Sequence, residues 1–147
     1  MKFKTTTVAL VALTVIGIQY SSLRAQSPRS VWDGVYTDAQ AKQGQGLYND
    51  KCSSCHGDTL MGGESAPALA GGEFTSNWNG LTLGDLFERI RTTMPQSKPG
   101  SLSREVNAQI LAYMLSVNQF PAGKTELPQQ TEVLKEIKID ATKPNSK

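Results

Sequence analysis

Two cysteines and one histidine stand together in this chain, as Cys52-Ser53-Ser54-Cys55-His56, and they are its whole complement of both residue types. A disulfide between Cys52 and Cys55 would close almost no loop, so it would stabilise the fold little. A thioredoxin-like redox pair needs a βαβ setting, which the sequence lacks. A structural zinc site needs four N or S ligands, one more than the chain owns. The motif therefore has to serve another kind of site.

The spacing Cys-x-x-Cys-His is the attachment signal of a c-type haem. Two thiols three residues apart can reach the two vinyl groups of a haem and form thioethers, and the histidine that follows can swing its imidazole under the iron. We therefore expect one covalent haem c, with Cys52 and Cys55 as its tethers and His56 as an axial ligand of the iron. Such a cofactor is a large body against which long loops can pack.

The second axial ligand has to come from another residue type, because His56 is the only histidine. Met61 follows His56 too closely to round the haem edge at roughly 3.5 Å per residue. Met114 lies inside a predicted helix, where a methionine ordinarily fills the core. Met94 stands in a predicted loop before Pro95, so we expect it as the second ligand; an open sixth position is the alternative. His/Met ligation fills both axial positions and favours electron transfer.

Residues 1–25 have the order of a secretory signal peptide: a basic start with Lys2 and Lys4, an apolar run over residues 7–18, and small residues up to Ala25. The apolar run is shorter than the roughly 20 residues of a comfortable membrane span. We expect cleavage after Ala25, a periplasmic or otherwise exported protein, and no membrane span after cleavage. An uncleaved N-terminal anchor is the alternative.

The formal net charge of +2 depends partly on this leader, which carries three basic residues and no acidic one. Without it, basic and acidic residues are nearly balanced. The sequence therefore gives no support to nucleic-acid binding, and it lacks the lysine-dominated surface that would dock to a strongly acidic partner.

Helix signals predict an all-α domain with long loops. Thr37 or Asp38 can cap a helix over residues 39–51, and Thr82, with Asp85 three residues later, begins a helix that ends near residue 92. Ser103 caps a third helix over 104–116. Residues 57–72 and 96–101 are predicted loops, rich in Gly, Pro and Ala or Ser. No convincing strand is predicted.

The domain organisation follows from these elements. We expect a flexible N-terminus over 26–34, a haem domain over 35–120 and a C-terminal extension over 121–147. The extension is rich in Pro, Lys and Gln, and we expect it to lie on the domain surface or to be partly disordered. One short amphipathic piece is predicted in it, with Val133, Leu134, Ile137 and Ile139 as its apolar residues.

Over about residues 35–120 the sequence resembles class I cytochrome c. Gly44 and Tyr48 precede Cys52 as the helix-packing glycine and aromatic of that family do, and Ile110 and Tyr113 match its C-terminal helix. The resemblance implies the class I cytochrome c fold, in which three main helices and long loops wrap one haem. It also implies that the first and last helices cross at Gly44.

Two further segments resemble the family. Ala66-Pro67-Ala68-Leu69-Ala70-Gly71 is similar to its Pro-x-Leu-x-Gly loop, which implies a hydrogen bond from His56 Nδ1 to the Pro67 carbonyl. Met94-Pro95 is similar to its distal ligand segment. Trp78 stands where small bacterial members place a residue that binds a haem propionate, although a buried Trp would look the same. Arg91 could also reach a propionate, but a solvated helix charge is the simpler interpretation.

The favoured hypothesis is an electron-transfer protein rather than an enzyme. Its donor would be a periplasmic dehydrogenase, and its acceptor an oxidase or another cytochrome. The C-terminal extension resembles that of cytochromes serving such dehydrogenases, so a permanent subunit of a dehydrogenase complex is one alternative. A haem enzyme or gas sensor with an open sixth position is the other, although no second histidine is present for acid–base work.

Overall fold

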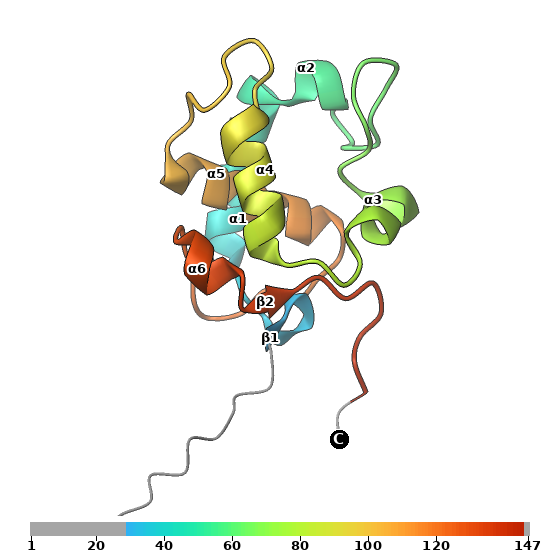
Figure 1. Cartoon of the computed structure of the whole chain (residues 1–147), viewed down its shortest axis with the longest axis vertical. Coiled ribbons are helices and arrows are strands. Elements are labelled where there is room, and N and C mark those ends of the chain that lie inside the picture. Colours follow the sequence, from blue (N-terminus) through green and yellow to red (C-terminus); the bar gives the residue numbers. More distant parts are fainter. Residues whose placement is uncertain (1–28, 146–147) are drawn as a thin grey trace, which may run out of the picture.

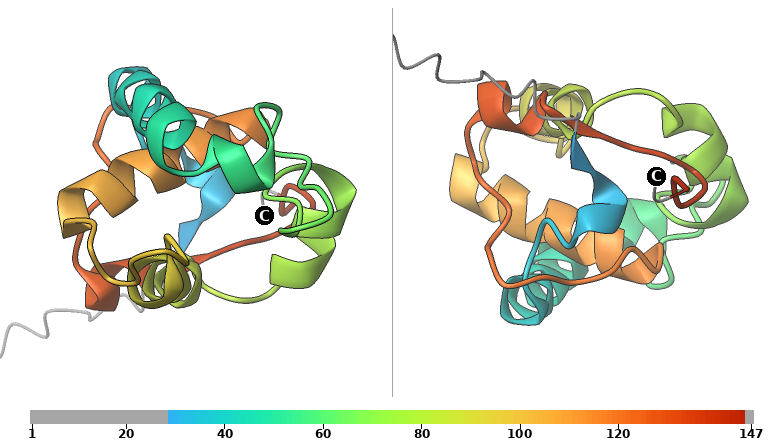
Figure 2. Two further views of the ribbon diagram at one scale, coloured as in Figure 1. Left: turned by 90° about the horizontal axis from the view of Figure 1, so that it is seen from above. Right: turned by 90° about the horizontal axis from the view of Figure 1, so that it is seen from below.

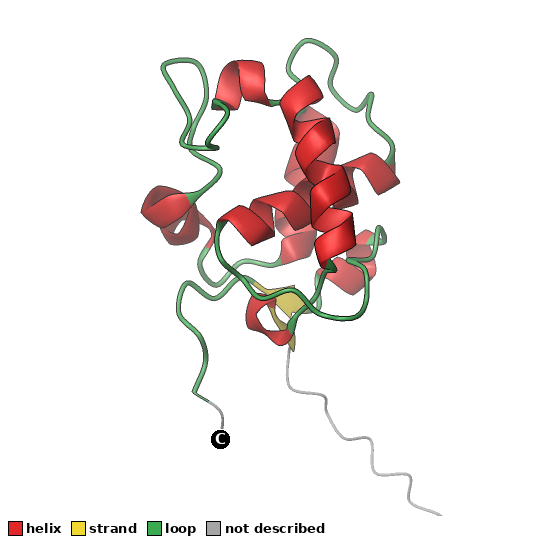
Figure 3. Cartoon of the chain, turned by 180° about the vertical axis from the view of Figure 1, so that it is seen from behind, coloured by secondary structure: helices red, strands yellow, loops and turns green. Residues whose placement is uncertain are grey.

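The computed structural model describes residues 29–145, so the predicted signal peptide over 1–25 lies outside the described residues. The all-α class is confirmed for this part of the chain: helices and long loops form the body, and the strands have only two residues each (Figure 3). None of the helices in residues 29–145 is both long and apolar enough to span a membrane. The elements are β1 (Arg29–Ser30), a 3-10 turn (Val31–Asp33), α1 (Asp38–Lys51), α2 (Ser53–His56), α3 (Gly71–Trp78), α4 (Leu83–Thr93), α5 (Arg104–Val117), α6 (Thr131–Leu134) and β2 (Ile137–Lys138).

Helices α1 and α5 form the most extensive helix–helix contact of the fold (Figures 1 and 2). They cross at Gly44, where a Cβ atom would stand 1.8 Å from the Gln109 carbonyl oxygen. Beside the crossing, the rings of Tyr48 and Tyr113 lie 5.5 Å apart. The expected helix crossing is therefore confirmed, and glycine is required there because the two backbones touch.

The predicted helix starts are confirmed by their capping contacts. Thr37 Oγ1 accepts a hydrogen bond from the Gln40 amide, and Ser103 caps α5 in the same way. Thr82 and Asp85 form a complete capping box at the start of α4. Helix α4 ends at Thr93, and Met94 has an extended backbone, as expected for a residue before proline.

Helix α3 is absent from the sequence prediction, which treats residues up to 72 as loop and Trp78 as a residue between elements. Its start has no side-chain cap, so no capping signal marks it. The Asn118 side chain accepts from the Gly71 amide instead, at 3.0 Å. Phe74 and Trp78 share one face of the helix, and Phe74 is fully buried.

The C-terminal extension belongs to the core rather than to the surface. Four of its apolar side chains, Leu127, Leu134, Ile137 and Ile139, are at most 2 % exposed. Strand β2 pairs in parallel with β1, and the extension runs beneath the helices (Figure 1). The expectation of a surface or partly disordered segment is wrong for these residues, because the helices alone leave apolar surface that the extension covers.

The start of the described chain also differs from expectation. Residues 26–34 were expected to be flexible, but Arg29 and Ser30 pair with β2 and Val31 is fully buried. The Trp32 indole N–H donates to the Asp140 carbonyl oxygen at 2.9 Å, and Ser30 donates to the Asp140 carboxylate. From residue 29 onward the segment is therefore held by the C-terminal extension.

Candidate haem site

A cavity of about 430 Å³ is lined by segments that are distant along the chain. We call the lining residues between 51 and 69 the His56 wall and those between 77 and 96 the Met94 wall; Ile110 and Met114 of α5 complete the lining. The volume lies within the usual range for ligand pockets. The lining residues are Lys51, Cys52, Cys55, His56, Ser65, Ala66, Pro67, Ala68, Leu69, Asn77, Trp78, Leu81, Leu86, Arg89, Ile90, Met94, Pro95, Gln96, Ile110 and Met114.

The two cysteines lie side by side at the end of α1 and in the single turn of α2. Cys52 is partly buried and Cys55 is exposed, and neither is in a disulfide. Burial, and to a lesser degree the neighbouring Cys55, raises the pKa of the Cys52 thiol to about 11. A protonated thiol is a poor metal ligand. Within residues 29–145 no group of three His, Cys, Asp or Glu side chains could hold a metal ion.

His56 is held in one orientation by the loop that follows it. The imidazole is 7 % exposed, and its Nδ1 lies 2.9 Å from the Pro67 carbonyl oxygen. A carbonyl oxygen can only accept, so Nδ1 carries the proton and Nε2 keeps its lone pair for a ligand. The contact that the family resemblance implies is present in the structure.

The backbone of the His56 wall is fixed by short-range hydrogen bonds. The Gly62 amide donates to the His56 carbonyl at 2.9 Å, and the Leu69 amide donates to the Leu60 carbonyl at 2.7 Å. The Tyr48 hydroxyl donates to the Gly57 carbonyl at 2.7 Å. Burial raises the pKa of Tyr48 to about 12, so its hydroxyl stays a neutral donor.

Met94 lines the same cavity as His56 and comes from the end of α4. It is the C-cap of α4, and its amide donates to the Ile90 carbonyl at 2.9 Å. Met61 is 60 % exposed and does not line the cavity. Met114 lines the cavity from within α5 and is 1 % exposed. The structure thus brings two methionines to the cavity: Met94 at the end of α4 and Met114 within α5.

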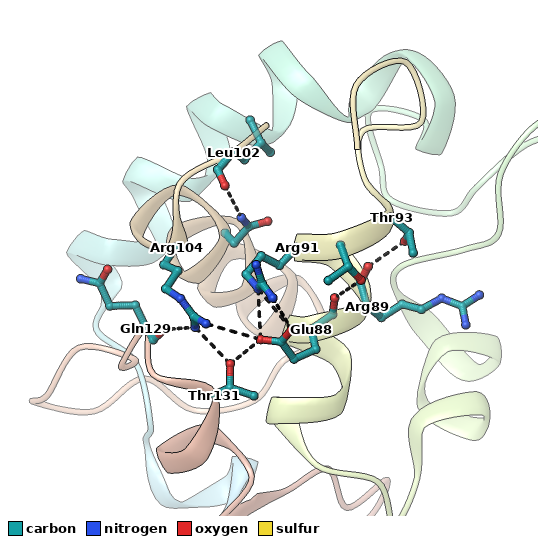
Figure 4. Close-up of polar contacts among 10 residues, drawn as sticks. Glu88, Arg89, Arg91, Thr93, Leu102, Arg104, Gln129 and Thr131 are labelled. Carbon is teal, nitrogen blue, oxygen red and sulfur yellow. Dashed lines mark hydrogen bonds and ion pairs between the residues drawn. The ribbon is translucent and has the colours of Figure 1, made fainter. Parts of the chain in front are cut away.

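Trp78 lines the cavity at the end of α3, but Arg91 does not line it. The Arg91 guanidinium instead pairs with the Glu88 carboxylate at 2.7 Å (Figure 4). Sequence reasoning missed Arg89, which does line the cavity. Helical spacing could have identified Arg89 as a lining residue, because Leu86, Ile90 and Met94 share one face of α4 and position 89 borders that face.

The residues around the cavity fit a haem c. One wall supplies two thiols and an imidazole with a free Nε2, and the other supplies a thioether sulfur, which together are the tethers and axial ligands of that cofactor. Apolar side chains make up most of the remaining lining, and no Asp or Glu is part of it. A flat, mainly apolar ring system matches this environment.

The family model described as "Cytochrome C oxidase, cbb3-type, subunit III" matches residues 39–114. No curated protein sequence matches the chain. Among solved structures, the sulfane dehydrogenase SoxCD from Paracoccus pantotrophus is similar, with 22% sequence identity and a TM-score of 0.48 over 84% of this chain and 68% of that chain.

Proposed function

The chain belongs to the class I c-type cytochromes, through the family of cytochrome c domains that includes subunit III of cbb3-type cytochrome c oxidase, and on that premise we propose that it carries single electrons on one covalently bound haem c. Proteins of this family hold haem c through thioether bonds. A haem bound here supplies an iron that alternates between its ferrous and ferric states. The rest of the proposal concerns what the side chains of this chain do.

Each site residue has one role in the proposal. Cys52 and Cys55 would tether the haem, and His56 Nε2 and Met94 Sδ would bind its iron. The Pro67 carbonyl keeps the imidazole in its ligating orientation. Trp78 lines the same cavity, and we assign its indole N–H to a haem propionate.

The observation that carries the proposal is that Cys52, Cys55, His56 and Met94 line one cavity. If His56 and Met94 both bound the iron of a haem held there, a substrate would have no ready access to it. Thioether sulfur also favours the reduced iron and raises its potential. The lining holds one histidine, His56, and no Asp or Glu, and in this proposal His56 binds the iron, which leaves no side chain of these types for acid–base catalysis. This supports an electron carrier over an enzyme.

The proposal includes a place and partners. The leader-like residues 1–25 support export to the periplasm, where covalent attachment keeps the cofactor from diffusing away. A periplasmic dehydrogenase would give the electron, and an oxidase or another cytochrome would take it. Cys55 is exposed at the cavity, which supports transfer through the adjoining haem edge. Such redox encounters are small and transient.

The Met94→Ala variant tests the axial ligand, with Met114→Leu as the matched control in the same cavity. Oxidised wild-type protein should show a weak Met-to-iron absorption in the far red. We expect Met94→Ala to lose this band and the reduced variant to bind carbon monoxide readily. Met114→Leu should keep the band and resist carbon monoxide, because leucine replaces methionine in a core with little cost.

Two results would overturn the proposal. If the band persists in Met94→Ala, Met94 is not the ligand. If reduced wild-type protein binds carbon monoxide as readily as Met94→Ala does, the sixth position is open, and an enzyme or gas sensor becomes the better description.

A further inference from the structure

Asn107 is a fully buried amide in α5, with an exposed fraction of 0 %. It stands three and seven residues before Ile110 and Met114, which line the cavity. Residues with this spacing share one face of an α-helix. Asn107 itself is not part of the cavity lining. Its side chain therefore lies on the cavity-facing side of α5, about one turn beyond the cavity.

The amide nitrogen of Asn107 holds two backbone carbonyl groups. Nδ2 donates to the Leu102 carbonyl oxygen at 3.2 Å and to the Ser103 carbonyl oxygen at 2.8 Å. Carbonyl oxygens can only accept, so the nitrogen of the amide faces them. The Ser103 carbonyl also accepts the backbone amide of Asn107 at 3.0 Å. The Leu102 carbonyl is therefore the one that depends on the side chain.

The oxygen of the same amide is left without a partner. Within residues 29–145, Asn107 Oδ1 is the one buried side-chain nitrogen or oxygen that forms no hydrogen bond. An unpaired buried acceptor costs free energy. Leucine has a similar branched shape and would be buried at this position without that cost. The two hydrogen bonds from Nδ2 are therefore what an asparagine contributes here.

The Leu102 carbonyl lies at the end of the segment that follows Met94. We call this segment, residues 95–102, the Met94 loop. Its backbone hydrogen bonds are two short turns within the loop, with donor–acceptor distances of 2.9 and 3.3 Å. In the part of the chain that the structure describes, the bond from Asn107 is the only hydrogen bond between the Met94 loop and the rest of the protein (Figure 4).

The two ends of the Met94 loop are thus held by different helices. At its start, the Met94 amide donates to the Ile90 carbonyl at 2.9 Å and continues α4. At its end, Asn107 of α5 binds Leu102. A segment held at both ends has fewer conformations than one held at a single end. The bond from Asn107 therefore disfavours arrangements of the loop in which Met94 has moved away from the cavity.

From these contacts we infer that Asn107 is a positioning residue, which holds the end of the Met94 loop and so keeps Met94 in place to bind the iron. The inference rests on the proposed function, since it assumes a haem iron for Met94 to bind. Asn107 acts through the loop, because it does not line the cavity. Loss of its amide should leave the haem attached at Cys52 and Cys55 and make Met94 easier to displace.

The test is the displacement of Met94 by added imidazole in the oxidised holoprotein, followed as loss of the far-red Met-to-iron band. We expect Asn107→Leu and Asn107→Ala to bind imidazole about two- to tenfold more tightly than wild type, the factor by which one typical hydrogen bond changes an equilibrium constant. Asn107→Leu should unfold near the wild-type temperature, because it removes the unpaired oxygen and leucine favours a helix. Asn107→Ala repeats the measurement with a smaller side chain, should leucine not fit the core.

Ser103→Ala is the matched control at the same end of α5. The Ser103 hydroxyl caps the helix by accepting from the Val106 amide at 3.2 Å, and its loss leaves the bond from Asn107 to Leu102 in place. We expect a lower unfolding temperature than for wild type with an unchanged affinity for imidazole. An equal gain in affinity for Ser103→Ala and Asn107→Leu would assign the effect to a loosened helix start and overturn the inference.

The remaining outcomes separate the inference from the proposed function. If both Asn107 variants show the far-red band and bind imidazole as weakly as wild type does, the inference is wrong and the proposed function stands. If wild type itself lacks the band, Met94 is not the ligand, and the proposed function fails first. The role of Asn107 then falls with it.

Discussion

The His56 wall and the Met94 wall line the same cavity. The hydrogen bonds that hold them in place differ in how far apart along the chain the bonded residues are. The His56 wall is tied within a short stretch. His56 bonds to Pro67, Leu69 bonds to Leu60, and the Tyr48 hydroxyl bonds to Gly57. All these partners lie between residues 48 and 69, although the Asn118 side-chain amide also donates to the Leu69 carbonyl at 3.0 Å.

The Met94 wall is held by a segment far along the chain. In the linker before α4, the Gly80 amide donates to the Ile139 carbonyl at 2.8 Å, and the Ile139 amide donates to the Leu81 carbonyl at 2.9 Å. At Gly84 of α4, a Cβ atom would stand 2.7 Å from the Lys135 amide nitrogen. The C-terminal extension thus supports the wall from behind.

Because of this difference, we expect that the two proposed iron ligands, His56 and Met94, can be perturbed separately. The first ligand stands in the attachment motif itself, and nearby bonds orient it. The second ligand depends on the placement of α4, and the extension contributes to that placement. Changes in the extension should therefore displace Met94 more readily than His56.

The largest effect is expected when residues 127–147 are deleted. The deletion removes four side chains that are at most 2 % exposed, each contributing about 1.5–3 kcal/mol through burial. Their sum is comparable to the whole stability of a typical domain, about 5–15 kcal/mol. We expect a far lower unfolding temperature and loss of the far-red band, with haem still attached at Cys52 and Cys55.

A shorter deletion, of residues 143–147, is the control and should change nothing, because Lys143, Pro144 and Asn145 are exposed. Absorption spectra, carbon monoxide binding and thermal melts of the two deletions make the comparison. A full-strength band and a wild-type melting temperature after the longer deletion would mean that the Met94 wall does not need the extension.

The next largest effect is expected for Gly44→Ala, in the helix that leads into the His56 wall. Its Cβ would meet the Gln109 carbonyl oxygen at 1.8 Å, and backbone cannot move aside cheaply. We expect a loss of about 3 kcal/mol, at the upper end of the range for overpacked sites. Denaturant unfolding of the holoprotein measures it.

Gly46→Ala is the matched control, in the same helix with nothing within 4 Å of the added Cβ. It should stabilise the protein by roughly 0.5–1 kcal/mol, because alanine is the better helix former. Equal effects of the two variants would show that the close crossing of α1 and α5 is not what makes Gly44 necessary.

The smallest effect is expected for Glu88→Gln, which weakens the link between the Met94 wall and the extension. Hydrogen bonds, first from Arg91 and then from Thr131, lower the pKa of Glu88 to about 2 from its ordinary 4.5. The folded state thus favours the ionised carboxylate, and its contribution is present above pH about 4.5 and is lost as pH falls towards 2. For this partly exposed group we expect a cost of about 1 kcal/mol at pH 7.

Unfolding of wild type and Glu88→Gln at several values between pH 7 and pH 2 makes the measurement. Acid effects on the other groups are common to both proteins, so the difference between them reports on Glu88. That difference should shrink below pH about 4.5 and vanish near pH 2. A gap that stays constant over this range would show that the charge of Glu88 contributes nothing to stability.

Much of the helical framework could be predicted because its signals are local. Thr82 and Asp85 mark the start of α4 in four consecutive residues, and Pro95 marks its end. Helix α3 could not be predicted in this way. Its first amide donates a hydrogen bond to the side chain of Asn118, a residue far along the chain. The two glycines at its start are typical of a loop.

The candidate site also has a part that could be predicted from local sequence and a part that could not. The placement of Pro67 beside His56 could be anticipated from a contiguous motif and a family resemblance. The choice between Arg89 and Arg91 could not, because either helix face can turn inward until the packing of α4 is known. The partner that decides it is Glu88, whose carboxylate also contacts Thr131 of the extension.

The sequence by itself determined the chemistry of the His56 wall and the starts and ends of the three long helices. Attachment motifs, caps and turns involve residues a few positions apart, so local composition is enough to specify them. Tertiary packing was needed to show that the C-terminal extension is part of the core, and that Arg89 lines the cavity while Arg91 does not. Those choices depend on which distant segments bury apolar surface together, and that burial energy has no signature in any single stretch of the chain.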